Sequence, residues 1–158
     1  MRGKWLAAAA AGCFFTAVAM TVHMREKADE SSRPHTQCTL RFETVTLENV
    51  PQVTELAQME RGLSERDDIS SGMLFTWNDD LLRVFWMKDT KMPLSVAFID
   101  STGMVTQIED MEPETEDLHW SSSEVREGLE LRQGDFEKLG IKPGSRLIDR
   151  KCSMINQQ

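Results

Sequence analysis

The chain has 158 residues and carries 26 acidic against 18 basic side chains, a net charge of −8. Its basic residues occur only as scattered pairs, so the composition argues against a nucleic acid partner. An acidic surface is also repelled from anionic lipid headgroups, so membrane attachment would have to come from a dedicated apolar segment.

Such a segment lies at the N-terminus, where a basic start precedes the uncharged stretch 5–22. This order is typical of a secretory signal peptide, and the small residues at 17–19 would place cleavage before Met20. An uncleaved anchor is the alternative, because spans of roughly 17 to 25 apolar residues cross a bilayer. Lipidation at Cys13 is a third, weaker possibility. We predict an exported protein, periplasmic or extracellular, that contacts the membrane only through 5–22 if that stretch is uncleaved.

Beyond this segment, residues 23–37 are rich in charge and contain no Leu, Ile or Val, which predicts a flexible linker. Residues 38–152 have the length of one ordinary domain, and 153–158 form a short tail. Cys38 and Cys152 stand at the two edges of the domain, and an exported domain with two cysteines favours a disulfide. Two unpaired thiols remain the alternative.

The first half of the domain predicts one strand, one helix and a hairpin. Alternation over 40–47 changes phase near Glu43, which predicts a strand with an irregularity. Apolar residues at helical spacing predict a short helix over 51–63. Two apolar runs, 73–77 and 81–87, are separated by the turn-forming Asn-Asp-Asp triplet and predict a hairpin.

The second half predicts a further hairpin, from 94–99 and 104–108, and then a strand over 128–132. A short helix should follow from Asp135 and stop at Gly140, and a last strand should cover 146–149. Many short strands with two short helices indicate a mainly β, strand-dominated α+β domain. The expected architecture is a small barrel or a rolled, antiparallel-rich sheet.

Four segments together resemble a known family. They are Arg61-Gly62-Leu63, Gly72-Met73-Leu74-Phe75, the block from Phe85 to Asp100, and Met111-Glu112-Pro113-Glu114-Thr115. The chain is similar over most of 40–149 to the bacterial and archaeal family called domain of unknown function 192. That family has no assigned mechanism, so the resemblance implies a shared fold but no activity. The chain departs from the usual pattern at Asp89, where Asn is common, and at Ser95, where an acidic residue is common.

The leading candidate binding site consists of Trp86, Lys88 and Asp89, where a predicted strand ends and a charged turn begins. Glu130 is added to it, because alternation directs this carboxylate away from the leucines on either side, and the resemblance includes an acidic residue here. The alternative is a half-exposed tryptophan that packs on a lysine stem beside a solvated turn.

A catalytic interpretation uses Glu130 or Asp100 as a general base, with Lys88 stabilising developing negative charge. Asp100 directly precedes a Ser-Thr-Gly turn, so its alternative role is to cap that turn. His119 stands before three serines, yet a triad needs a third group that the sequence cannot place.

Metal sites and cofactors are not expected. The acidic segment 109–117 lacks EF-hand spacing, the three histidines are too dispersed for a zinc site, and core packing explains the many methionines better than copper binding. The favoured function is a non-catalytic binding domain whose partner is a polar small molecule, a glycan or an envelope protein. The alternatives are an envelope structural or assembly protein and a hydrolase that uses Glu130 or Asp100 with Lys88.

Overall fold

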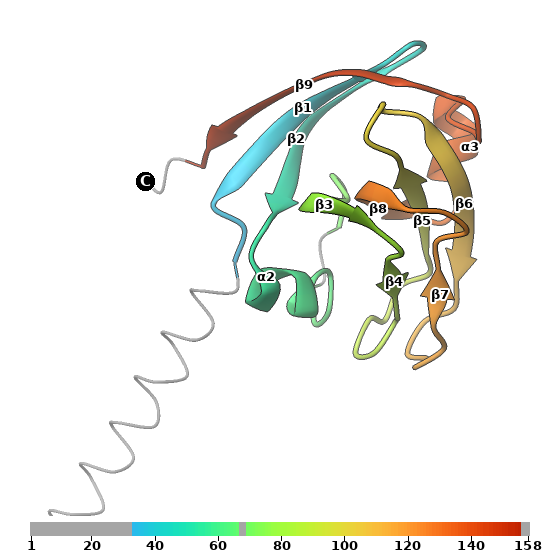
Figure 1. Ribbon diagram of the computed structural model, residues 1–158. Coiled ribbons are helices and arrows are strands. Elements are labelled where there is room, and N and C mark those ends of the chain that lie inside the picture. Colours follow the sequence, from blue (N-terminus) through green and yellow to red (C-terminus); the bar gives the residue numbers. More distant parts are fainter. Residues whose placement is uncertain (1–32, 67–68, 156–158) are drawn as a thin grey trace, which may run out of the picture. The chain divides into compact units, whose positions relative to one another are not determined.

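The computed structural model describes residues 33–66 and 69–155, so the predictions on the signal segment, on most of the linker and on the last three residues lie outside the described chain. Within those ranges the chain forms nine strands and two helices (Figure 1). In chain order they are β1 (Thr36–Phe42), β2 (Thr46–Val53), α2 (Leu56–Arg61), β3 (Met73–Leu81), β4 (Val84–Phe85), β5 (Leu94–Ile99), β6 (Val105–Met111), β7 (His119–Trp120), β8 (Val125–Arg132), α3 (Asp135–Leu139) and β9 (Leu147–Met154).

Seven strands form one sheet in the order β6-β5-β8-β3-β2-β1-β9, and β4 pairs with β7 in a separate two-stranded sheet. Every neighbouring pair of strands in the large sheet is antiparallel except β2 and β3, which run parallel and are connected through α2. A parallel pair needs such a crossover because a tight turn can only reverse the chain.

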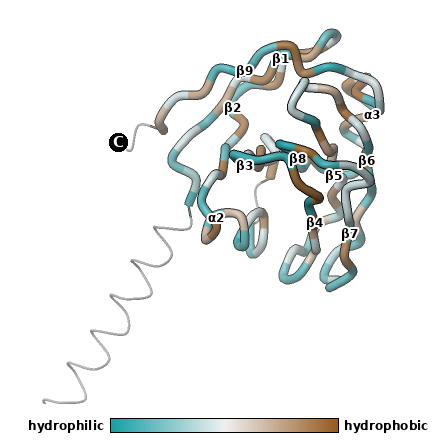
Figure 2. Tube along the Cα trace, viewed as in Figure 1, coloured by the Kyte–Doolittle hydropathy of each residue, from teal (hydrophilic) through white to brown (hydrophobic). Residues whose placement is uncertain are grey.

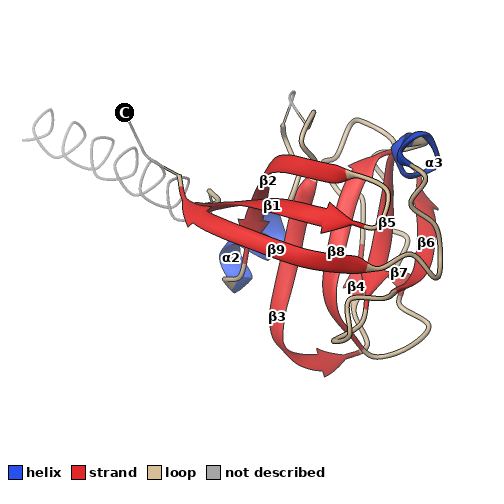
Figure 3. Cartoon of the chain, turned by 90° about the horizontal axis from the view of Figure 1, so that it is seen from above, coloured by secondary structure: helices blue, strands red, loops and turns tan. Residues whose placement is uncertain are grey.

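The large sheet rolls into a half-barrel, which is clearest from above (Figure 3). A single antiparallel bridge between Met104 and Arg146 joins the beginnings of the two edge strands. The predicted strand-dominated fold with a rolled, antiparallel-rich sheet and two short helices is therefore confirmed. No helix in the described ranges is long and apolar enough to cross a membrane.

Two hydrophobic cores form because alternate residues of the central strands point to opposite faces of the sheet. One core contains Leu129 and Leu131 of β8, and the other contains Met73 and Phe75 of β3. All six residues of β5 are buried, as expected for a strand covered on both faces. In Figure 2, hydrophobic residues recur along β2, β4 and β5, which border these cores.

Two predictions in the first half of the domain are wrong. The expected hairpin around residues 78–80 does not form, because β3 continues through them to Leu81 and pairs with β2 and β8. Pairing of β3 with β8 resumes at Leu81, and along the stretch Arg83 forms an ion pair with Asp79 and Arg126 with Asp80. The phase change near Glu43 is the turn between β1 and β2 rather than an irregularity inside one strand.

The helix predicted over 51–63 is also too long. Residues 51–53 belong to β2, where Pro51 faces Gln37 and Val53 is fully buried. The helix begins only after Glu55, whose side chain forms a capping box with Gln58, and it ends at Gly62, whose φ of 49° suits glycine.

The second half of the domain follows its predictions closely. The hairpin of β5 and β6, strand β8 and helix α3 all form, with Gly140 ending α3 in the left-handed conformation. Strand β9 runs further than expected, to Met154. Cys38 and Cys152 face each other across β1 and β9 and form the predicted disulfide.

Candidate functional site

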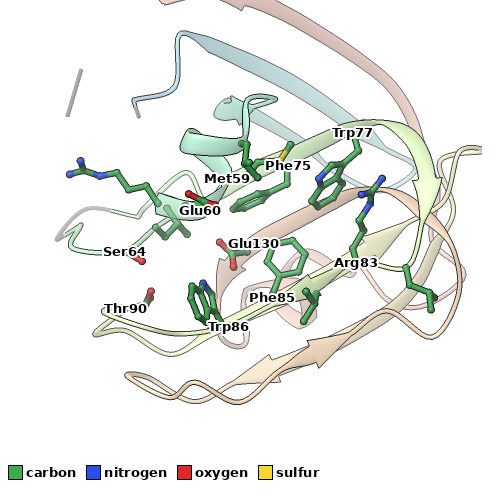
Figure 4. Close-up of a pocket in the computed structure, with 16 residues that line it drawn as sticks. Met59, Glu60, Ser64, Phe75, Trp77, Arg83, Phe85, Trp86, Thr90 and Glu130 are labelled. Atoms are coloured by element: carbon green, nitrogen blue, oxygen red, sulfur yellow. The ribbon is translucent and has the colours of Figure 1, made fainter. Parts of the chain in front are cut away.

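A cavity of about 350 Å³ opens beside α2, on the sheet face that carries the Met73 and Phe75 core. Its volume lies in the range of small-molecule sites. The walls come from α2 and the turn after it, from β3, from the segment around β4, and from one residue of β8 (Figure 4).

Aromatic rings form the main wall of this cavity. Phe85 meets Phe75 edge to face at a centroid separation of 5.0 Å and Trp77 at 6.1 Å. The tip of the Phe85 ring can approach β8 closely because the residue there is Gly128. A Cβ at that position would come within 2.5 Å of the ring. Trp86 lines the same cavity and is 44% exposed, so it extends the aromatic wall to the mouth.

Glu130 places a carboxylate inside this cavity. Its strand neighbours Met73 and Val96 are fully buried, and Glu130 itself is only 4% exposed. Figure 4 shows the carboxylate pointing into the space beside Phe75, Phe85 and Trp86. In residues 33–66 and 69–155, no group hydrogen-bonds or ion-pairs with it. Burial therefore raises the pKa of Glu130 to about 8.

Three other charged side chains line the cavity. Arg83 stacks on Trp77, 4.6 Å from the ring centroid, and forms an ion pair with Asp79. Arg61 has interactions of its own. Glu60 is exposed on α2. Glu130 is thus a buried carboxyl group with which none of the surrounding described residues forms a hydrogen bond or an ion pair.

Lys88 and Asp89, the predicted turn residues, line a neighbouring depression that shares Trp86 with the cavity. The ammonium of Lys88 is 5.6 Å from the centroid of the Trp86 ring and 3.8 Å from a carboxylate oxygen of Glu116. Asp89 has a φ of 55°, a left-handed conformation that Asp and Asn tolerate better than most residues. The left-handed backbone at this position therefore explains why the chain has Asp89 here, without any role in ligand binding.

This turn is held rigidly. The Ser64 hydroxyl donates to the Lys88 carbonyl at 2.9 Å, and the Glu65 N–H donates to the Asp89 carbonyl at 2.9 Å. On the other side, the Met87 N–H donates to the Thr115 carbonyl at 3.1 Å. The segment that carries Trp86 is consequently fixed between two loops.

The structure does not bring Asp100 into this site. It lies at the turn between β5 and β6, where its carboxylate accepts hydrogen bonds from the Thr102 hydroxyl and the N–H groups of Thr102 and Met104. Partial burial raises its pKa, but these hydrogen bonds outweigh that effect and hold the pKa below its usual value. Asp100 lines neither the cavity nor the depression beside it.

Ser95 also lies elsewhere. Its hydroxyl donates to Asp110 at 2.5 Å, in a hollow shared with Phe136 and Ile141 of the opposite core. Ser95 is therefore on the sheet face opposite Glu130, so the lack of a carboxylate at this position does not alter the cavity.

His119 pairs with Glu109, with its Nδ1 at 2.7 Å from a carboxylate oxygen. The Ser121 hydroxyl instead accepts the Arg83 N–H at 2.9 Å. The acidic segment is likewise divided among separate partners. Among the described residues, no group of three or more His, Cys, Asp or Glu side chains is arranged to hold a metal ion.

The aromatic wall was missed by the sequence analysis, which found only Trp86 and Glu130 among the cavity residues. One signal for it existed, because Phe75 and Trp77 are two residues apart in a strand and must share a face. Phe85 gave no such signal, since its contact with β3 depends on the pairing of β4 with β7.

The fold and the cavity define a rolled-sheet domain with a buried carboxylate in an aromatic site. Residues 40–148 match the model of the DUF192 family, described as "Uncharacterized ACR", and the chain belongs to this family. The prediction from the sequence motifs is thereby confirmed. No curated protein matches the chain.

Two crystal structures share the fold. A protein of unknown function from Novosphingobium aromaticivorans is 24% identical, with a TM-score of 0.64 over 73% of this chain and 83% of its own. A protein from Sinorhizobium meliloti, named as a proposed transcription regulator, is 30% identical, with a TM-score of 0.64 over 74% of this chain and 92% of its own.

Proposed function

We propose that this protein is a non-catalytic binding domain for a small molecule that enters the cavity beside α2. The observation that carries this proposal is the buried carboxylate of Glu130, which lies without a described partner inside an aromatic cavity. A buried carboxylate that only stabilised the fold would be paired. The ligand would pack an apolar part on the rings and direct a polar group to Glu130.

The hydrolase alternative is less well supported. It requires a base and Lys88 to converge on a substrate, whereas Asp100 is occupied by its own turn and lines no part of the cavity. Lys88 lines the neighbouring depression, where it interacts with Trp86 and Glu116. In the proposed binding domain, Lys88 and Asp89 would contact only a part of the ligand that extends beyond the mouth.

Location and partner class are also proposals. The disulfide supports an exported domain, because such bonds persist mainly in oxidising compartments. The name of the Sinorhizobium relative points to gene regulation, but a net charge of −8 does not favour binding to nucleic acid. An envelope structural role remains the second candidate, and it would make no use of the cavity.

The proposal is tested by screening a set of soluble fragments that carry amine, hydroxyl, amide or carboxylate groups. Binding is followed through the indole N–H signals of Trp77 and Trp86 in NMR spectra. Trp86→Ala should weaken any hit by at least about tenfold, because a ring at the mouth supplies much of the contact area.

Trp120→Ala is the matched control. Trp120 is an exposed tryptophan on β7 that does not line the cavity, so its loss should leave binding unchanged. A screen in which no fragment moves either indole signal would reject the small-molecule proposal and leave the envelope structural role in front.

A further inference from the structure

The charges around the cavity indicate which kind of ligand it would take. Arg83 is neutralised by Asp79 and covers the face of Trp77, while Arg61 has interactions of its own. The remaining charged groups that line the cavity are the carboxylates of Glu60 and Glu130. From β3 and β5, the residues opposite Glu130 are the apolar Met73 and Val96. Glu130 is therefore a carboxyl group without a described partner, and it becomes a negative charge inside the cavity when it ionises.

The rings add to this preference. The face of an aromatic ring carries negative electrostatic potential, and it attracts cations within about 6 Å of its centroid. Both tryptophans of the site already show this behaviour, since Arg83 lies over Trp77 and Lys88 lies near Trp86. The rings of Phe75 and Phe85 border the space in front of Glu130 (Figure 4). An anionic ligand would gain nothing from Glu130 in either form and would be repelled once it ionises, and the chain's net charge of −8 would also oppose its approach.

We infer that the cavity binds an organic ammonium ion, with the charged nitrogen against the carboxylate of Glu130 and its carbon substituents against Phe75, Phe85 and Trp86. This inference rests on the proposed function and specifies its ligand class. The cation supplies the partner that Glu130 lacks among the described residues.

Binding of this kind is coupled to the release of a proton. Because burial raises the pKa of Glu130 to about 8, the empty cavity holds this group mostly protonated at neutral pH. An ammonium ion binds the ionised form, so the proton leaves to solvent as the ligand enters. Apparent affinity scales with the ionised fraction of Glu130, which rises on the order of a hundredfold between pH 6 and pH 9.

The test uses two probes of the same shape. Choline carries a permanent charge that does not titrate, and 3,3-dimethyl-1-butanol replaces its nitrogen by carbon. Each is titrated into the wild-type protein at pH 6 and at pH 9, and the Trp77 and Trp86 indole signals report binding. Choline should bind at least about tenfold more tightly than the alcohol at pH 9, and its affinity should rise on the order of a hundredfold between the two pH values.

Glu130→Gln should abolish both the preference for choline and its pH dependence, because the amide keeps the shape without the charge. Glu112→Gln is the control, since Glu112 is exposed and does not line the cavity. The comparison of the two probes in the wild-type protein remains decisive even where the Glu130 variant fails to fold.

The outcomes separate the two proposals. Equal binding of choline and the alcohol, with no change between pH 6 and pH 9, would overturn the ammonium inference and leave a small-molecule site in place. An absence of binding by choline and the alcohol, together with a negative fragment screen, would overturn the proposed function and this inference with it.

Discussion

Glu130 is a residue whose ionisation should oppose folding. Its pKa is about 8 in the folded state and near the ordinary glutamate value of 4.5 in the unfolded chain. Below pH 4.5 the group is protonated in both states and has no effect on stability. Between the two values the unfolded chain loses a proton that the folded protein keeps, so the free energy of unfolding falls as pH rises.

We therefore expect Glu130→Gln to stabilise the empty protein at neutral pH. Relative to the wild type, its free energy of unfolding should increase by roughly 3 kcal/mol between pH 4 and pH 7, because each pKa unit of difference corresponds to about 1.4 kcal/mol. Urea unfolding followed by tryptophan fluorescence at several pH values measures this difference. Parallel stability curves for the two proteins would show that Glu130 is not protonated by burial.

The residue scale also shows how far the sequence could define the site. Strand alternation was enough to direct Glu130 away from Leu129 and Leu131, because that periodicity is local. Local sequence cannot show that Glu130 lacks a described partner, because this depends on which residues of α2 and β4 approach β8 in space. The sequence therefore located the carboxylate and not the cavity around it.

At the scale of elements, predictions succeeded where a strand and its partner are adjacent in the chain. Strands β5 and β6 are joined by the five residues 100–104 and behave as their local pattern indicates. Strand β3 instead pairs with β2 across a helix and with β8 from much later in the chain. Those distant partners keep it extended through a sequence that favours a turn, because its pairing with β8 continues at Leu81.

One ion pair connects two elements that are not neighbours in the sheet. Glu127 of β8 is 1% exposed and pairs with Arg150 of β9. Burial raises the pKa of Glu127, and the positive charge of Arg150 opposes that rise. Arg150→Met should lower the free energy of unfolding by about 3 kcal/mol, because it leaves a buried carboxylate without its cation.

The loss in Arg150→Met should be larger at pH 8 than at pH 5, since protonation of Glu127 at low pH removes the unpaired charge. Chemical unfolding at both pH values measures it. The double variant Glu127→Gln with Arg150→Met provides the control, and it should recover part of the stability. Equal losses for the single and double variants would mean that Arg150 contributes through packing rather than charge.

For the whole molecule, the disulfide joins the beginning of the sheet to its end. Cys38 and Cys152 are 114 residues apart in the chain and directly opposed in the pair formed by β1 and β9. Beyond its first residue, where Leu147 donates to the Gly103 carbonyl, β9 is an edge strand that pairs with β1, so the covalent bond is well placed to keep it in the sheet. The prediction of this bond needed only composition and the expected compartment.

Replacing Cys38 and Cys152 together by serine should lower the free energy of unfolding by about 5 kcal/mol in the chain-entropy model, since the closed loop is long. The same change should accelerate amide hydrogen exchange in β9 after Leu147 far more than in β5 or β8, because that part of β9 has a partner strand on one side only. Urea unfolding and hydrogen exchange of the oxidised wild type and the double variant measure both effects. Unchanged exchange in β9 would show that the hydrogen bonds to β1 hold this strand without the disulfide, and the stability lost would then come from the unfolded chain alone.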